Sequence, residues 1–218
     1  MIDAAILSLV GAVVFFVGWH FGVSSTRLRA VLVDRFGEKG FAGLFSLVSL
    51  AGLVWIIVAY RAAPVIWLWG RPEWAVWLVI VAMPVALTMI FGVGPKNTLG
   101  PMSPVTRHPM FWGMVLWASV HIAANGDVAS IILFGGMGLL ALLGTFAIYA
   151  KTRRRDPDGW ARLVATTSNL PLVALIDGRT TLSAKALAKP FALAMGAYVV
   201  ITLLHHFVFG LKLPIYGG

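Results

Sequence analysis

The chain has 218 residues, of which 60% are hydrophobic and only 11% are charged, and its mean hydropathy is +0.90. This composition excludes an ordinary soluble domain and indicates an integral membrane protein. The chain has no cysteine, which excludes disulfides, thiolate nucleophiles, iron-sulfur clusters, cysteine-ligated zinc and covalent attachment of c-type haem.

Six apolar runs approach the roughly 20 residues that a helix needs to cross a bilayer. In chain order they are Ala4 to Phe21, Gly40 to Tyr60, Trp74 to Val93, Met110 to Ala124, Ala129 to Tyr149 and Pro190 to Phe209. The fourth run is short: it either extends back through Pro109, which the first turn of a helix tolerates, or crosses only part of the membrane. The sequence therefore predicts an all-α fold, a polytopic membrane bundle of about six transmembrane helices that forms one domain over residues 1–218.

The basic residues lie mostly on one side of these spans. Of the 17 Lys and Arg residues, four follow the first span, two follow the third, and eight lie in the loop of about residues 150–189 after the fifth. By the positive-inside rule these connections are cytoplasmic, so both termini are predicted to lie outside the cytoplasm of a bacterial-type inner membrane. The net charge of +9 then faces the inner leaflet, which predicts anionic membrane lipid, and not nucleic acid, as its partner.

Histidines in or next to apolar spans are costly, so each is a candidate functional residue. His20 lies near the cytoplasmic end of the first run, between Gly18 and Gly22. Neutral imidazole is a common metal ligand, and glycine removes bulk where a planar cofactor could approach the backbone. An interfacial histidine beside a small-residue packing face is an equally good interpretation. The adjacent His205 and His206 are interpreted as interfacial residues near the end of the last run.

Residues 106–127, TRHPMFWGMVLWASVHIAANGD, contain two further histidines. On a helix, thirteen residues at ~100° each place His108 and His121 on nearly opposite faces and ~20 Å apart along the axis, so they cannot bind one metal ion together. The helix face of His121 also presents Gly113, Trp117 and Ala124. These side chains would leave room for a flat cofactor beside an aromatic wall. A buried histidine that hydrogen-bonds to a neighbouring helix fits the same spacing.

This stretch, with WHFGVSSTRLRAVLVDRFGEKGFAGLFSLVSLAGLVWI upstream and GWARLVATTSNLPLVALIDGR downstream, resembles the NnrU family of membrane proteins over most of the chain. That family includes plant zeta-carotene isomerases, which carry b-type haem and isomerise a cis double bond of a carotenoid. Its bacterial members are named for an association with nitrite and nitric oxide reduction. The resemblance implies that His20 and His121 are axial ligands of haem iron. It also implies cofactor contacts for Arg107, His108, Asn125 and Asp127, beside Gly113 and Trp117.

The predicted topology conflicts with this ligand pair. His20 lies near the cytoplasmic end of its span and His121 near the outer end, whereas two ligands of one iron must lie at similar depth. His108 is therefore the alternative metal ligand, with His20 as its partner at the inner end.

A second resemblance is to membrane methyltransferases of the isoprenylcysteine type, whose RHPxYxG-like segment helps to bind S-adenosylmethionine. Here that segment has Phe111 in place of the tyrosine, and no glutamate follows it in the chain. The predicted function is that of a haem b protein that isomerises a lipophilic polyene such as a carotenoid. The first alternative is a non-catalytic haem protein of nitrite and nitric oxide metabolism, acting as a sensor, haem handler or assembly factor. The second alternative is an S-adenosylmethionine-dependent membrane methyltransferase.

Overall fold

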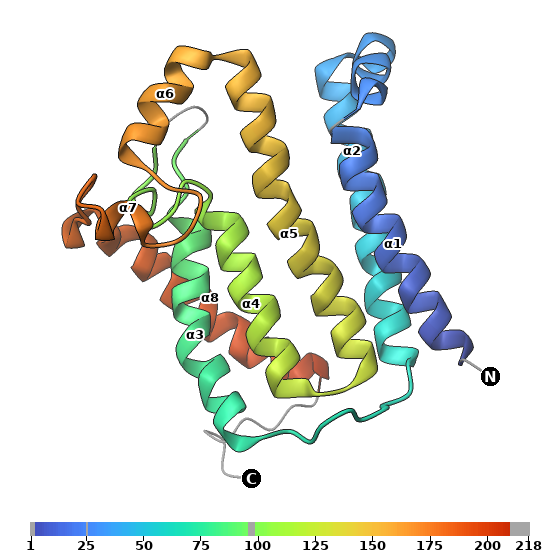
Figure 1. Cartoon of the computed structure of the whole chain (residues 1–218). Coiled ribbons are helices and arrows are strands. Elements are labelled where there is room, and N and C mark those ends of the chain that lie inside the picture. The colour runs from blue at the N-terminus through green and yellow to red at the C-terminus, as the bar shows by residue number, and fades with distance from the viewer. Residues whose placement is uncertain (1–2, 25, 96–98, 210–218) are drawn as a thin grey trace. The chain divides into compact units, whose positions relative to one another are not determined.

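The computed structural model describes residues 3–24, 26–95 and 99–209, in which the regular elements are helices (Figure 1). The helices are α1 (Ala4–Ser24), α2 (Arg27–Ala62), α3 (Glu73–Phe91), α4 (Pro109–Asn125), α5 (Val128–Arg155), α6 (Pro157–Thr166), α7 (Val173–Ile176) and α8 (Ala184–Phe209). The prediction of an all-α fold is thus confirmed for this part of the chain.

Five of these helices, α1, α2, α3, α5 and α8, are long and apolar enough to cross a membrane. The chain is therefore a multi-pass membrane protein. The fourth predicted span corresponds to α4, which has only 17 residues. The predicted count of about six spans is not confirmed, because the short fourth run of the sequence remains a short helix.

The chain divides into two compact units. The first consists of residues 1–76 and 118–147, and the second of residues 77–117 and 148–218. Helices α4 and α5 each contribute to both units. The single domain over residues 1–218 stays a prediction.

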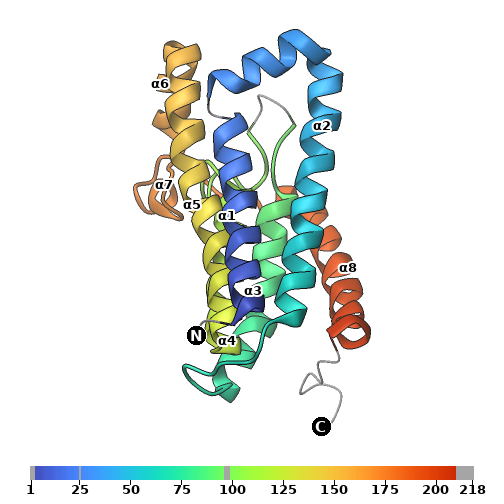
Figure 2. The same ribbon diagram turned by 90° about the vertical axis from the view of Figure 1, so that its right-hand side faces the viewer.

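In the first unit, α1 and α2 form an antiparallel pair. The Trp55 Nε1 group donates to Ser8 Oγ at 3.1 Å, and the buried Gly52 packs beneath the ring of Phe16. Gly37 interrupts α2 with a φ of +70°, a backbone conformation that glycine adopts at little cost. Figure 2 shows the consequence: the segment of α2 before Gly37 runs across the end of α1, and the rest runs back alongside it.

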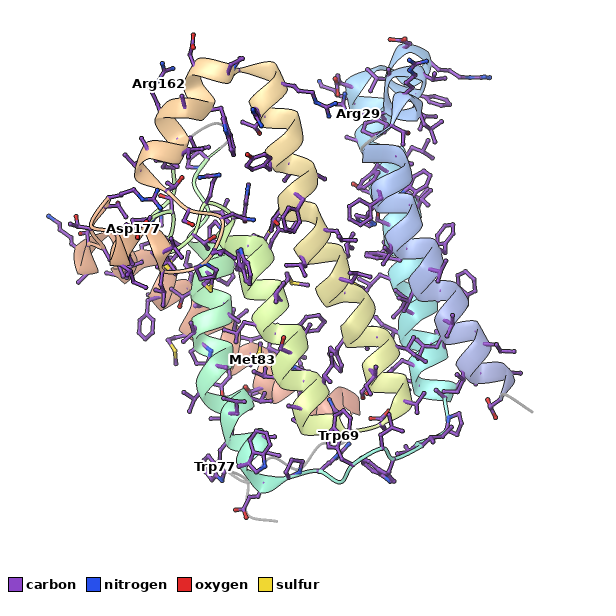
Figure 3. All side chains as sticks on the ribbon, viewed as in Figure 1. Arg29, Trp69, Trp77, Met83, Arg162 and Asp177 are labelled. Atoms are coloured by element: carbon purple, nitrogen blue, oxygen red, sulfur yellow. The ribbon has the colours of Figure 1, made fainter. Side chains whose placement is uncertain are left out.

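The connection after α2 packs against the turn between α4 and α5, also in the first unit. The backbone amides of Leu68 and Trp69 donate to Gly126 O at 2.9 and 3.1 Å, and Trp69 Nε1 donates to Ala123 O at 3.2 Å (Figure 3). Gly126 has a φ of +71°, and a Cβ atom there would collide with Trp69. Both constraints require glycine at this turn.

In the second unit, α3, α4 and α8 share a small apolar core. It consists of Met83, Leu87 and Ala194, with Val79, Ile90, Trp117, Tyr198 and Ile201 packed around them. Gly113 of α4 lies against Ala86 O of α3, so close that a Cβ atom would clash with this oxygen. The close approach of α3 and α4 brings the residues that precede α4 next to the end of α3.

Candidate functional site

A cavity of about 840 Å³ opens in the second unit beside the Arg-His-Pro element. Arg107 and His108 line it directly before the start of α4. The other polar side chains of its wall come from the end of α5 and from α6 and the residue before it: Thr152, Asp156, Arg162 and Thr166. The apolar part of the wall is formed by Leu99, Ile148 and Leu163. Pockets of ~300 to 1,000 Å³ hold cofactors and drug-sized ligands, so the cavity has the size of a small-molecule site.

Arg107 is fixed by residues some sixty positions further along the chain. Its Nε donates to Thr167 Oγ1 at 2.9 Å, and its Nη2 donates to Thr167 O at 3.0 Å. Its guanidinium carbon lies 4.6 Å from the ring centre of the buried Trp160, as in a cation–π pair. The side chain is therefore held in one place by Trp160 of α6 and by Thr167, the residue that follows this helix.

The charge of Arg107 has no carboxylate partner among the described side chains, whose ion pairs are Arg29 with Glu38 and Arg179 with Asp177. Burial, and then the nearby Arg179, lower the pKa of Arg107 from its usual value, although the group stays protonated at neutral pH. The carboxylate in the cavity wall, Asp156, instead accepts a hydrogen bond from Gly159 N at 2.9 Å as the N-cap of α6. The wall is thus suited to an anionic group of a ligand.

His108 is a neutral base at this wall. Burial, and then the adjacent positive charge of Arg107, lower its pKa to about 4, so its imidazole carries no charge at pH 7. The buried Nε2 atom of His108 has no hydrogen-bond partner within the described part of the chain. A neutral ring with an unused nitrogen can bind a metal ion or a ligand donor.

Sequence reasoning did not identify three residues that build this site, namely Thr106, Trp160 and Thr167. Thr106 is fully buried, and its Oγ1 donates to Asn169 O at 2.7 Å. The backbone amide of Arg107 donates to Ser168 O at 2.7 Å. Trp160 and Thr167 lie in the downstream segment that resembles the family, which was the one sign in the sequence of their importance. No local sequence pattern connects them with Arg107.

The histidines of the first unit lie in separate surroundings. The ring of His20 lies 5.1 Å from that of Phe45 in α2, and the ring of His121 lies 4.8 Å from that of Phe134 in α5. These neighbourhoods can be compared along the parallel helices α1 and α5, because Gly136 of α5 packs against Val13 of α1 (Figures 1 and 2). His20 lies seven residues after Val13, which is ~10 Å further along α1. Phe134 lies two residues before Gly136 in α5.

His20 of α1 and His121 of α4 thus each pack against an aromatic ring of another helix. Ligation of one iron by this pair stays a prediction.

The remaining predicted site residues have structural contacts. Gly113 and Trp117 take part in helix packing in the second unit. Asn125 Nδ2 donates to His121 O at 2.9 Å. The buried Asp127 accepts bonds from Ser130 N at 2.9 Å and Ser130 Oγ at 2.6 Å, and so caps α5. Their cofactor contacts stay predictions.

Of the two histidines of the last helix, His205 is not part of the cavity wall. His205 Nδ1 lies 2.9 Å from Ile201 O, in the preceding turn of α8. The side chain of His206 lies outside the described residues. Within the described ranges, no three His, Asp or Glu side chains gather in a group that could hold a metal ion.

A family model described as "NnrU protein" matches residues 8–213, which is nearly the whole chain. Neither a curated protein nor a solved structure matches.

Proposed function

The chain belongs to the NnrU family, and from this premise we propose that it binds haem b at the cavity beside Arg107 and His108 and isomerises a lipophilic polyene such as a carotenoid. One observation carries the proposal. His108 lines a cofactor-sized cavity, is neutral at pH 7, and has a buried Nε2 without a partner in the described residues. Such an imidazole meets the requirement for an iron ligand.

The residues of the cavity would share the binding of haem in a simple way. His108 would hold the iron, and Arg107 would hold a haem carboxylate with the charge that lacks a carboxylate partner among the described side chains. Leu99, Ile148 and Leu163 would exclude water from the apolar edge. Without cysteine, attachment has to be non-covalent. When bound, haem supplies an iron centre that interacts with a conjugated π system and lowers the barrier to rotation about a cis double bond.

Absorption spectra of the purified protein, oxidised and dithionite-reduced, test haem binding. We expect a haem b spectrum from haem-replete cells and complete extraction of the pigment by acid acetone. Replacing His108 by Ala should abolish or shift the spectrum, whereas His20→Ala and His121→Ala should retain it. Circular dichroism melts check that each variant is folded. A colourless protein would refute the proposal, and loss in His20→Ala and His121→Ala but not in His108→Ala would restore the pair implied by the family.

The isomerase activity is tested separately from haem binding. Expression in cells that accumulate a cis carotenoid precursor should change its isomer profile in the dark, where photoisomerisation cannot contribute. An unchanged profile with haem bound would favour a non-catalytic haem protein of nitrite and nitric oxide metabolism, such as a sensor, haem handler or assembly factor.

A specific observation also favours a second candidate, an S-adenosylmethionine-dependent methyltransferase. The Arg-His-Pro element, which resembles the cofactor segment of membrane methyltransferases, lines a cavity that also presents the hydroxyls of Thr152 and Thr166. Such a wall suits a zwitterionic cofactor with hydroxyl groups. Equilibrium dialysis of the purified protein with radiolabelled S-adenosylmethionine distinguishes the candidates: saturable binding that Arg107→Ala removes would support the methyltransferase.

A further inference from the structure

The connection between α6 and α8 exposes three large apolar side chains within seven residues. Leu170 is 58% exposed, Leu172 is 52% exposed and Ile176 is 79% exposed. Apolar surface in contact with water is unfavourable, and several such side chains on one connection mark an interaction surface. None of the three lines the cavity described above, so the proposed function does not account for them.

This connection is held in a fixed conformation. The amide of Leu172 donates to Val105 O at 2.7 Å, and Arg179 Nη1 donates to Val164 O and Thr167 O, both at 2.9 Å. Leu172 itself has a φ of +68°, a left-handed conformation that is unfavourable for a leucine. The surrounding hydrogen bonds thus hold the backbone of Leu172 in a strained conformation in which its apolar side chain is exposed. Strain of this kind points to a function for the position of the side chain.

The same hydrogen bonds place the connection close to the ends of the apolar helices. Its partner residues Val105 and Arg107 lie only a few positions before α4 begins at Pro109. On the other side, α8 begins at Ala184, eight residues after Ile176, and is itself a candidate span. The three apolar side chains therefore lie at the level where the apolar helices of the second unit begin. Figure 3 shows this region beside the labelled Asp177.

The charges near this connection indicate which kind of apolar partner it contacts. Exposed basic side chains precede and follow it in the chain, namely Arg162 on α6 and Lys185 and Lys189 on α8. The carboxylate of Asp177 at the end of α7 is already paired with Arg179 at 3.0 Å. Basic residues beside an apolar cluster at the boundary of a span are suited to anionic lipid headgroups.

We propose that residues 168–176 form a lipid anchor: Leu170, Leu172 and Ile176 enter the bilayer surface beside α8, while the neighbouring basic residues contact anionic headgroups. Side chains at such an interface are buried ~5 to 10 Å into the boundary between headgroups and acyl chains. The anchor would hold the connection that positions Thr167, and through it Arg107, at a fixed depth.

The absence of cysteine makes the anchor directly testable, because one introduced cysteine gives one label. We expect a nitroxide on Ile176→Cys, in the full chain in vesicles of phosphatidylethanolamine and phosphatidylglycerol, to collide more with oxygen than with a water-soluble nickel chelate. The matched control is Ala161→Cys, at an exposed position of α6 outside the cavity wall, where the ratio should reverse. Equal access of the nickel chelate at both positions would overturn the anchor. Protection of position 176 from both reagents, with spin–spin broadening, would instead indicate a second copy of the chain.

Discussion

Arg107 and Arg179 donate hydrogen bonds to the same carbonyl oxygen, that of Thr167, at 3.0 and 2.9 Å. Two guanidinium groups therefore meet at one acceptor, and among the described residues only Arg179 has a carboxylate partner, Asp177. The junction holds the residues before α4 against the connection that follows α6. Of these two arginines, Arg179 is paired with Asp177, while Arg107 adds a positive charge beside the cavity.

We expect Arg107→Ala to destabilise the protein by about 2 kcal/mol, because Thr167 loses hydrogen bonds to a charged group. Arg107→Lys should recover only part of this loss, because an ammonium group cannot reproduce the two bonds of the guanidinium and its contact with Trp160. Thermal unfolding in detergent measures both variants. Arg162→Ala, at the exposed side of the same cavity, is the control and should leave the melting temperature almost unchanged.

In the haem-free protein, the low pKa of His108 predicts a loss of stability in acid. In the folded state the pKa is about 4, against 6.5 for an unperturbed histidine, so the unfolded chain binds more protons between these values. The contribution of neutral His108 to the free energy of unfolding is fully present above pH 6.5. It is lost as the pH falls toward 4, which lowers the free energy of unfolding by up to about 3 kcal/mol. His108→Gln should flatten the pH dependence of the melting temperature in this window. Thr152→Ser, which alters the same wall without a titratable group, should keep the slope.

Gly126→Ala should destabilise the turn between α4 and α5. The residue has a φ of +71°, and a Cβ atom would collide with Trp69. We expect a loss of at least about 1 kcal/mol, measured by thermal unfolding. Gly135→Ala in α5 is the matched control, since nothing lies within 4 Å of a Cβ atom there, and it should stabilise the helix by up to about 1 kcal/mol. Equal melting temperatures for the two variants would contradict this account of the turn.

The orientation predicted from the basic residues can be tested with reporter fusions. Phosphatase fused near Arg71 should be active, because that connection is predicted to be external, and a fluorescent protein fused after Arg155 should fold in the cytoplasm. The opposite pattern would invert the predicted topology and place both termini in the cytoplasm.

The long helices could be predicted from the sequence because an apolar run of sufficient length has few other structures in a membrane. The predicted runs at Ala4 to Phe21 and Ala129 to Tyr149 lie within α1 and α5, respectively. The segment of α2 before Gly37 was missed, because its charged residues obscure the apolar signal. The four residues of α7 were also missed, because a helix this short depends on the hydrogen bonds around it.

The candidate site was predictable only in part. The resemblance to the NnrU family is confirmed. Arg107 and His108, which it implied as cofactor contacts, line the cavity, and their binding of a cofactor stays a prediction. The contact of Arg107 with Thr167 spans sixty positions, and no periodicity encodes a pairing of that length.

The shortness of α4 has a consequence for the surrounding bilayer. Its 17 residues extend ~26 Å along the axis, which is less than the ~30 Å of a typical hydrocarbon core. Such a hydrophobic mismatch is relieved when the lipid thins around the helix or when water enters above its end, at a cost of a fraction of a kcal/mol for each Å. In a thicker bilayer, rich in long acyl chains, a helix of this length would be under greater strain.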